Sequence, residues 1–192
     1  MTSDVDICNA ALNTLGANTI VSLTEDSVPA RLCNQRYESL RDAVFRSHPW
    51  NALIKRQQLA RDDSGPTYLY TYAFTLPGDC LRVLGISDGT AEWPTEDFDF
   101  QIEGRKIVTD EDDIYLKYIS RVTDPNEYDT LLRETLSAKI AAELAYSLTA
   151  SNGVASTFIE AYNSKLAEAR FVDGTEGKPA QMEADTWLRS RL

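Results

Sequence analysis

The sequence has few of the residues on which metal sites and many catalytic sites depend. Of its 192 residues, one is histidine and three are cysteine. The cysteines, Cys8, Cys33 and Cys80, form no Cys-x-x-Cys pair, so neither a zinc site nor a disulfide framework is expected. We predict three reduced, structural thiols, as suits a protein that folds in the cytosol.

Long apolar runs are also missing. The most apolar stretch, residues 138–150, is too short to span a membrane and contains Lys139 and Glu143. The first six residues contain no basic segment followed by an apolar run, so no secretory signal peptide is expected. We therefore predict no contact with a membrane.

Positive charge is scarce. Lysine and arginine number 19 against 30 aspartates and glutamates, which gives a net charge of -11. A free-standing nucleic-acid-binding protein usually has a basic patch and a high pI, and neither is evident. Between positions 88 and 113, only Arg105 and Lys106 oppose ten carboxylates. This acidic segment is either an ordinary solvated face or a surface that repels DNA passing close to it.

The first fifty residues predict two capped helices. Ser3 and Asp6 form a capping-box pattern, apolar residues follow at helical spacing, and Gly16 suits the end of the helix. A second helix is predicted from about Ser27, with Pro29 in its first turn. It should end near residue 48, because a proline follows there.

The middle of the chain has the alternating pattern of strands. Strands are predicted over residues 68–76, 81–86 and 114–119, with a hairpin formed by 98–102 and 106–109. They should form a small antiparallel sheet folded onto itself as a sandwich or barrel.

Helical spacing returns after this β-rich segment. Asp124 and Pro125 are predicted to cap a third helix, and the sequence 151–153 (SNG) should break it from a fourth that ends at Gly174. The predicted fold is thus α+β: a four-helix bundle core (1–52 plus 123–174), an inserted small antiparallel β domain (53–122) and an extended C-terminal tail (175–192). Trp187 in this tail either anchors a partner, as tryptophan often does, or folds back onto its own core.

No motif in the chain carries a reaction. His48, beside Pro49 and Trp50, has no nucleophile motif around it and is interpreted as a structural residue at a helix end. No phosphate loop or EF-hand pattern is present, and no cofactor is expected. Two carboxylates suffice for glycoside hydrolysis, and the best candidates are Glu92, Glu96 and Asp97, near Trp93 and Phe98. The simpler interpretation is an acidic loop over two buried aromatic rings.

Four stretches resemble one protein family when taken together and in order. The match is collinear over nearly the whole chain. The stretches are 6–12 (DICNAAL) with 15–17 (LGA); 22–27 (SLTEDS), 30–34 (ARLCN), 41–44 (RDAV) and 48–51 (HPWN); 76–83 (LPGDCLRV); and 118–125 (YISRVTDP). They resemble the tail tubular protein A family, the head-to-tail adaptor (connector) proteins of short-tailed bacteriophages.

The resemblance implies a structural role in the neck of a virion assembled in the host cytoplasm. It implies a ring, usually of twelve copies, that docks beneath the portal protein and receives the tail nozzle, a tail tubular protein B-like partner. Double-stranded DNA would pass through the ring without sequence-specific binding. The C-terminal residues Trp187, Leu188, Arg189, Arg191 and Leu192 would contact the portal. The acidic insert with Glu92, Glu96, Asp97 and Asp99 would face the channel or the nozzle.

Two functional hypotheses follow from the sequence. The leading one is a non-catalytic adaptor that acts through its interfaces. The alternative is a tail-associated hydrolase of glycans or peptidoglycan, which would use the carboxylates named above. A monomeric DNA-binding regulator is disfavoured by the charge and by the lack of a motif that reads bases.

Overall fold

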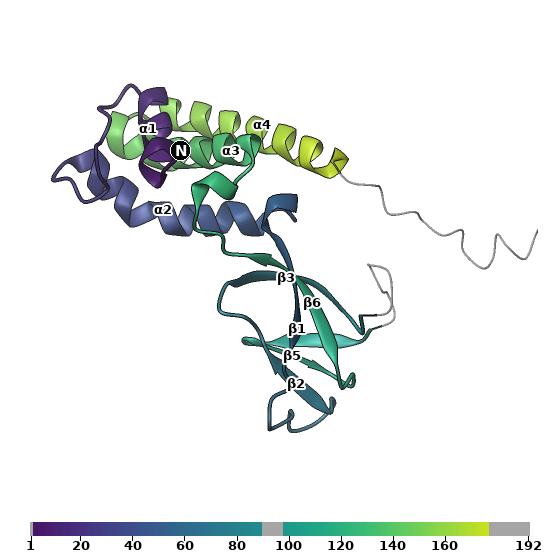
Figure 1. Ribbon diagram of the computed structural model, residues 1–192. Coiled ribbons are helices and arrows are strands. Elements are labelled where there is room, and N and C mark those ends of the chain that lie inside the picture. The colour runs from purple at the N-terminus through teal and green to yellow at the C-terminus, as the bar shows by residue number, and fades with distance from the viewer. Residues whose placement is uncertain (1, 90–97, 177–192) are drawn as a thin grey trace, which may run out of the picture.

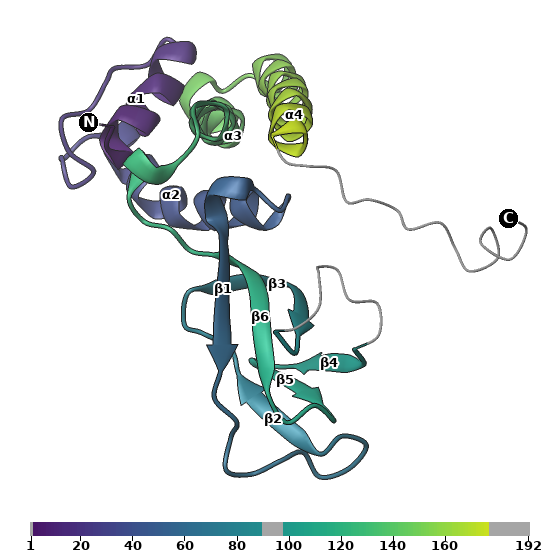
Figure 2. The same cartoon turned by 45° about the vertical axis from the view of Figure 1, so that its right-hand side comes forward.

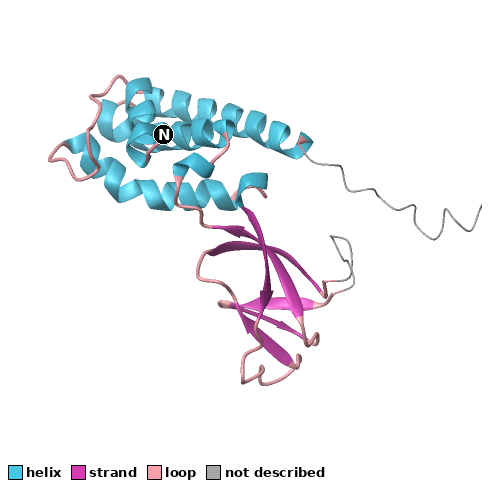
Figure 3. Ribbon diagram, in the orientation of Figure 1, coloured by secondary structure: helices cyan, strands magenta, loops and turns pink. Residues whose placement is uncertain are grey.

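The computed structural model describes residues 2–89 and 98–176 (Figure 1). The helices gather at one end of the molecule and the strands at the other, as the colours of Figure 3 make clear. Within the described residues there are four α-helices and two small antiparallel sheets. The predicted α+β class is confirmed.

Local capping signals define the first two helices. Helix α1 (Asp4–Thr14) begins with the predicted capping box, in which the Asp6 N–H donates to Ser3 Oγ and the Ser3 N–H donates to the Asp6 carboxylate. Gly16 has φ +69°, a left-handed conformation that glycine adopts without strain. Helix α2 (Val28–Arg46) begins at Ser27, whose hydroxyl accepts from the Ala30 N–H. Both helices therefore lie where the sequence predicts them.

The other two helices differ in detail from the prediction. Asp124 caps only a short 3₁₀ turn, η2 (Pro125–Glu127), and α3 (Thr130–Thr149) begins five residues later under the cap of Asp129. Ala150, with φ +51°, ends α3, and Ser151 caps α4 (Asn152–Thr175). The break between the two helices therefore consists of Ala150 and Ser151 alone. Residues 152 and 153, which were predicted to be part of the break, belong to α4.

Helix α3 is the central helix. It packs against α1, α2 and α4, and Figure 2 shows it between α1 and α4. Helix α4 contributes one fully buried residue, Ala169, to the helical core, although Phe158, Tyr162 and Leu166 pack partly against that core. It therefore leaves most of its surface exposed.

The strands form two three-stranded antiparallel sheets. The first has the order β1-β6-β3, made of β1 (Ile54–Leu59), β6 (Ile114–Ser120) and β3 (Cys80–Ser87). The second has the order β2-β5-β4, made of β2 (Tyr72–Thr75), β5 (Lys106–Thr109) and β4 (Phe100–Glu103). The predicted β4–β5 hairpin is confirmed, with Glu103 opposite Lys106. Leu59, Phe74, Leu76, Cys80, Ile86, Ile107, Ile114, Leu116 and Tyr118 form the core of this β domain.

Two strand predictions need correction. Strand β1, in which only Leu59 is buried, is not predicted from the sequence, because its polar residues have no alternating pattern. Residues 68–71, predicted as strand, lie in the loop between β1 and β2. There Leu69 has φ +75°, a value that an extended strand cannot contain.

The β domain is connected to the helices at one place. The chain enters it through the 3₁₀ turn η1 (Asn51–Leu53) and β1 and leaves it through β6. These two strands pair side by side, with Ile54 opposite Ile119. The helical core continues into this junction, where Leu81, Ile119 and Val122 pack with residues from the helices.

Candidate interaction surfaces

Most of the predicted site residues lie outside the described part of the chain. Trp187, Leu188, Arg189, Arg191 and Leu192 belong to residues 177–192, and Glu92, Glu96 and Asp97 belong to residues 90–97. Asp99 is the member of these sets that the structure describes. The predicted portal contacts therefore stay predictions.

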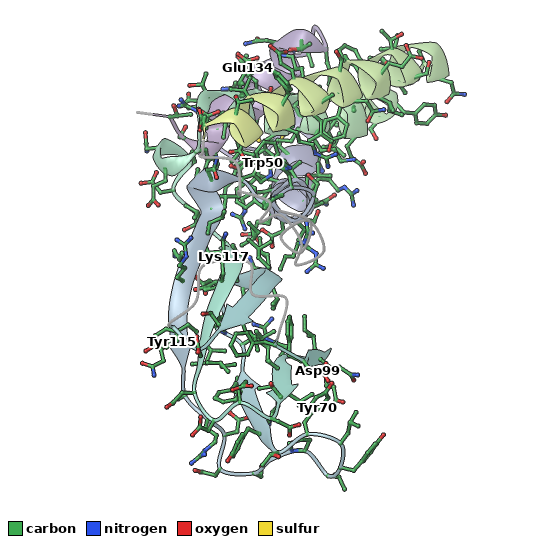
Figure 4. The ribbon with its side chains drawn as sticks, turned by 90° about the vertical axis from the view of Figure 1, so that its right-hand side faces the viewer. Trp50, Tyr70, Asp99, Tyr115, Lys117 and Glu134 are labelled. Carbon is green, nitrogen blue, oxygen red and sulfur yellow. The ribbon has the colours of Figure 1, made fainter. Side chains whose placement is uncertain are left out.

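Asp99 holds a buried tyrosine in place. The Tyr70 hydroxyl donates to Asp99 Oδ1 at 3.2 Å, and the Thr109 hydroxyl donates to the Asp99 carbonyl at 2.8 Å. Figure 4 shows Tyr70 and Asp99 next to each other in the part of the β domain that lies away from the helices. Burial raises the pKa of Tyr70, and the Asp99 charge adds to this effect. The Asp99 residue is nevertheless exposed, so it remains available to a partner.

The last described turn of α4 is tied to the end of α2. His48 Nε2 lies 3.0 Å from Asp173 Oδ2, and the Asn51 N–H donates to Asp173 Oδ1 at 3.0 Å. The Asn51 side-chain amide donates to the Asp173 carbonyl at 2.7 Å, and Arg170 donates to the Ser47 carbonyl at 2.8 Å. The tail therefore begins at the junction between the helical end and the β domain.

His48 lies just after α2, and its contacts are with other residues of the fold. Its ring packs edge-on against Trp50, with ring centroids 4.8 Å apart. Trp50 is 2% exposed, and its indole N–H donates to the Val44 carbonyl at 3.0 Å. Asp173 was not identified from the sequence, since nothing local marks a partner so far along the chain.

Polar contacts fix the β domain against α2. Arg46 donates to the Leu81 carbonyl, and Arg82 donates to the Arg46 carbonyl at 3.2 Å. Arg121, just after β6, places Nε and Nη2 each 2.8 Å from Asp42 Oδ2. The two ends of the molecule are thus held in one relative orientation by charged groups as well as by the shared core.

The residues that carry the family resemblance meet in this core and junction. Cys8 of the first stretch, Trp50 of the second, Leu81 of the third and Ile119 of the fourth belong to one buried cluster. Four stretches separated by tens of residues in the sequence therefore specify one scaffold. Their shared property is packing, because each contributes residues to this cluster.

The three cysteines, Cys8, Cys33 and Cys80, are all free and buried. Cys8 and Cys33 are adjacent in space although far apart in sequence, and the hydrogen bond between them together with burial raises the pKa of Cys8. Burial likewise raises the pKa of Cys80. The hydrogen bond with Cys8 lowers the pKa of Cys33, although burial opposes this effect. Cys33 is fully buried, so its thiol is not presented to solvent.

One small groove lies in the helical part of the molecule. A groove of about 240 Å³ lies between α1 and α3, lined by Thr2, Asp6, Ile7, Ala10, Thr130, Arg133 and Glu134. Ligand pockets usually measure about 300–1,000 Å³. In residues 2–89 and 98–176, no cluster of three or more His, Cys, Asp and Glu side chains could hold a metal ion. Within the same ranges no helix combines the length and apolar character needed to cross a bilayer.

Large apolar side chains are exposed at both ends of the molecule. On the β side they include Tyr68 and Leu69, and on the helical side they include Val21, Val28, Tyr146, Ile159 and Phe171. The chain matches no protein-family model, and a comparison with curated proteins finds no relative.

Proposed function

We propose that this chain is a structural head-to-tail adaptor of a phage virion, which works through interfaces at its two ends. The proposal rests on one observation: the four stretches that carry the family resemblance pack inside a molecule with a helical end and a β end. The stretches pack into the core and the junction, and they leave the helical surface and the far end of the β domain free to meet two different partners.

The helical end is assigned to the portal. In this proposal the four helices act as one bundle, and residues 187–192 bind the portal protein. The tail starts from an anchored point, since Asp173 fixes the end of α4. An anchored start limits where the following residues can reach, at most about 3.5 Å per residue.

The outer surface of α4 suits contacts between copies of the chain in a ring. A 24-residue helix with one fully buried residue exposes apolar side chains such as Ile159, at 50%, and Phe171, at 73%. In a ring each subunit contacts its two neighbours through two different faces. The exposed apolar side of α4 is therefore a suitable face for a neighbouring copy to cover. The net charge of -11 suits a channel wall along which DNA slides without binding.

Electron microscopy of the chain mixed with the portal protein encoded near it tests the proposal. We expect a ring of added density beneath the portal, with the helical end against the portal and the β domain pointing away. Failure to bind the portal at low and at moderate salt would refute the assignment and make the resemblance one of fold alone.

The same preparation discriminates the hydrolase hypothesis. The purified chain is incubated with peptidoglycan and with polysaccharides, alongside the Glu92→Gln, Glu96→Gln and Asp97→Asn variants. We expect no release of soluble sugar by any of them. Release by the wild-type chain that the variants abolish would contradict the adaptor assignment.

A further inference from the structure

The loop between β1 and β2, residues 60–71, lies at the end of the β domain away from the helices (Figure 1). It exposes two large side chains that are adjacent in sequence: Tyr68 is 80% exposed and Leu69 is 68% exposed. Single exposed apolar residues are ordinary on protein surfaces. Two adjacent, exposed, large side chains at the end of a domain are less ordinary, and the packing of the fold does not explain them.

The backbone at this position is strained. Leu69 has φ +75°, and the Tyr70 N–H donates to the Tyr68 carbonyl at 3.0 Å. A hydrogen bond between residues two apart around a positive φ defines a γ-turn of the rare, strained kind. A bulky residue seldom adopts a positive φ, and such outliers concentrate where a protein binds something. Asparagine or glycine would suit the backbone better than leucine does, so the leucine side chain is the informative feature.

Hydrogen bonds and close packing of the neighbouring residues hold the strained turn in place. The Thr71 N–H and hydroxyl both donate to Asp110 Oδ1, at 2.9 and 2.8 Å, and the Tyr70 ring is buried with its hydroxyl on Asp99. Gly65 approaches so closely that a Cβ atom there would lie 2.4 Å from the Thr71 carbonyl oxygen. The loop is therefore a fixed support that presents Tyr68 and Leu69 to the solvent. Such preorganisation reduces the entropy lost on binding.

The segment bonded to this loop through Thr71 and Asp110 is rich in carboxylates. The neighbouring β5–β6 turn contributes Asp110, Glu111, Asp112 and Asp113, and the loop itself contributes an exposed Asp63. Two nearby cations already have partners: Arg61 lies over the Tyr72 ring at 4.9 Å, and Lys106 pairs with Asp62 at 2.8 Å. This end of the molecule is therefore acidic. Phosphates of DNA, an anionic lipid surface and the same end of a second copy would all be repelled.

We propose that Tyr68 and Leu69 are the anchor by which the β domain docks into an apolar pocket, rimmed by lysine and arginine, on another protein. The neighbouring carboxylates pair with that rim and speed the encounter. The inference rests on the proposed function, in which the occupant is the tail nozzle protein. Aromatic anchors seated in pockets dominate the binding energy of many interfaces, which is the role assigned here to Tyr68.

The test measures binding of the purified nozzle protein encoded with this chain to the full-length chain assembled on its portal. The test variant is the double substitution Tyr68→Ser with Leu69→Asn. We expect its affinity for the nozzle protein to fall about tenfold or more. Its melting temperature should not fall, because asparagine tolerates a positive φ better than leucine. Assembly on the portal should be unchanged.

Two matched variants complete the design. Val21→Ser removes an apolar side chain that is 91% exposed at the helical end, and it should bind the nozzle protein as the wild type does. Asp112→Asn with Asp113→Asn removes charge beside the anchor and should slow association while weakening its dependence on salt.

Nozzle binding tests the anchor formed by Tyr68 and Leu69, and portal binding tests the adaptor function. Equal nozzle affinity of the wild type and the double variant would overturn the anchor while portal binding still supports the adaptor. A wild-type ring on the portal that binds no nozzle protein would also overturn the anchor. Absence of portal binding would refute the adaptor function by its own readout. Self-association of the free chain, or binding to anionic vesicles, that disappears in the double variant would overturn the assigned partner.

Discussion

His48 and Asp173 are 125 positions apart in the sequence, yet their side chains meet at 3.0 Å and join the end of α4 to the end of α2. The Asp173 carboxylate serves two donors, His48 and the Asn51 backbone, and its side chain is 12% exposed. Asp173 thus holds the last turn of α4 against the end of α2.

Replacing this carboxylate tests the connection. Asp173→Ala should lower the free energy of unfolding by about 1–2 kcal/mol, because the Asn51 N–H and His48 both lose their acceptor. Asp173→Asn keeps one acceptor oxygen and should lose less. The matched control, Glu176→Ala, changes an exposed residue one turn later and should lie close to wild type. Urea unfolding of the three variants gives the comparison, and equal midpoints for all of them would contradict it.

Tyr128 offers a test in the middle of the helical core. Its hydroxyl donates to the Val122 carbonyl at 2.9 Å, and its ring meets Phe45 edge-on at 5.2 Å. Tyr128→Phe keeps the ring and leaves the carbonyl without its donor. It should therefore lower the free energy of unfolding by about 1–2 kcal/mol at neutral pH. The matched control is Tyr68→Phe, which removes only an exposed hydroxyl and should leave the free energy of unfolding unchanged. Leu131→Ala would be a poor control because it also changes packing.

The same tyrosine predicts a dependence on alkaline pH. Burial raises the pKa of Tyr128 from its ordinary value of 10.0 to about 12. A pKa raised on folding contributes stability below pH 10, and this contribution is lost as the pH rises toward 12. The stability difference between wild type and Tyr128→Phe should therefore shrink over this range. Unfolding curves at pH 8, 10 and 11 check this, and a constant difference would contradict it.

The support beneath Leu69 can be tested through its glycine. Gly65→Ala places a Cβ atom 2.4 Å from a backbone oxygen, so the loop must shift. We expect a loss of about 1–3 kcal/mol in the free energy of unfolding. We also expect faster amide exchange in residues 60–71. Gly78→Ala is the matched control, because its Cβ atom would meet nothing within 4 Å. A neutral Gly65→Ala would mean that the loop is not held as described.

Deleting residues 181–192 separates folding from docking. All residues of the described cores lie at or before Ala169, so the deletion should leave the melting temperature unchanged. Under the proposed function it should weaken binding to the portal, because it removes Trp187 and the two following arginines. A truncated chain that unfolds would instead place Trp187 against its own core, the other alternative left open by the sequence. The single variant Trp187→Ala shows how much of the loss in portal binding is due to this one side chain.

Sequence patterns predicted the elements whose signals are local. Ser3 with Asp6 and Ser27 with Pro29 define helix starts within a few residues, and such caps do not depend on the rest of the fold. Strand β1 was missed because its polar residues become a strand only by pairing with β6, sixty positions away in sequence. Aromatic residues at 68–71 suggested a strand, but the bonds from Thr71 to Asp110 hold them in a loop.

The candidate site was predicted less completely than the fold. Tryptophan and arginine in the tail and carboxylates in the insert stand out by composition, and Asp99 is the one of them whose contacts are described. Leu69 could not be found in the same way, because its significance lies in a positive φ that no sequence pattern announces. Asp173 is likewise an ordinary helix-end aspartate until α4 folds back along α3.

The pairing of Ile54 with Ile119 has a consequence for how such a chain can change over time. The β domain begins and ends on neighbouring strands, so a shorter, longer or unrelated segment could replace it while the helices keep their course. Insertions succeed most often where their two ends lie close together. One side of the molecule can thus adapt to a new binding partner while the other keeps its old one, and a chimaera exchanged at this point would inherit one specificity from each parent.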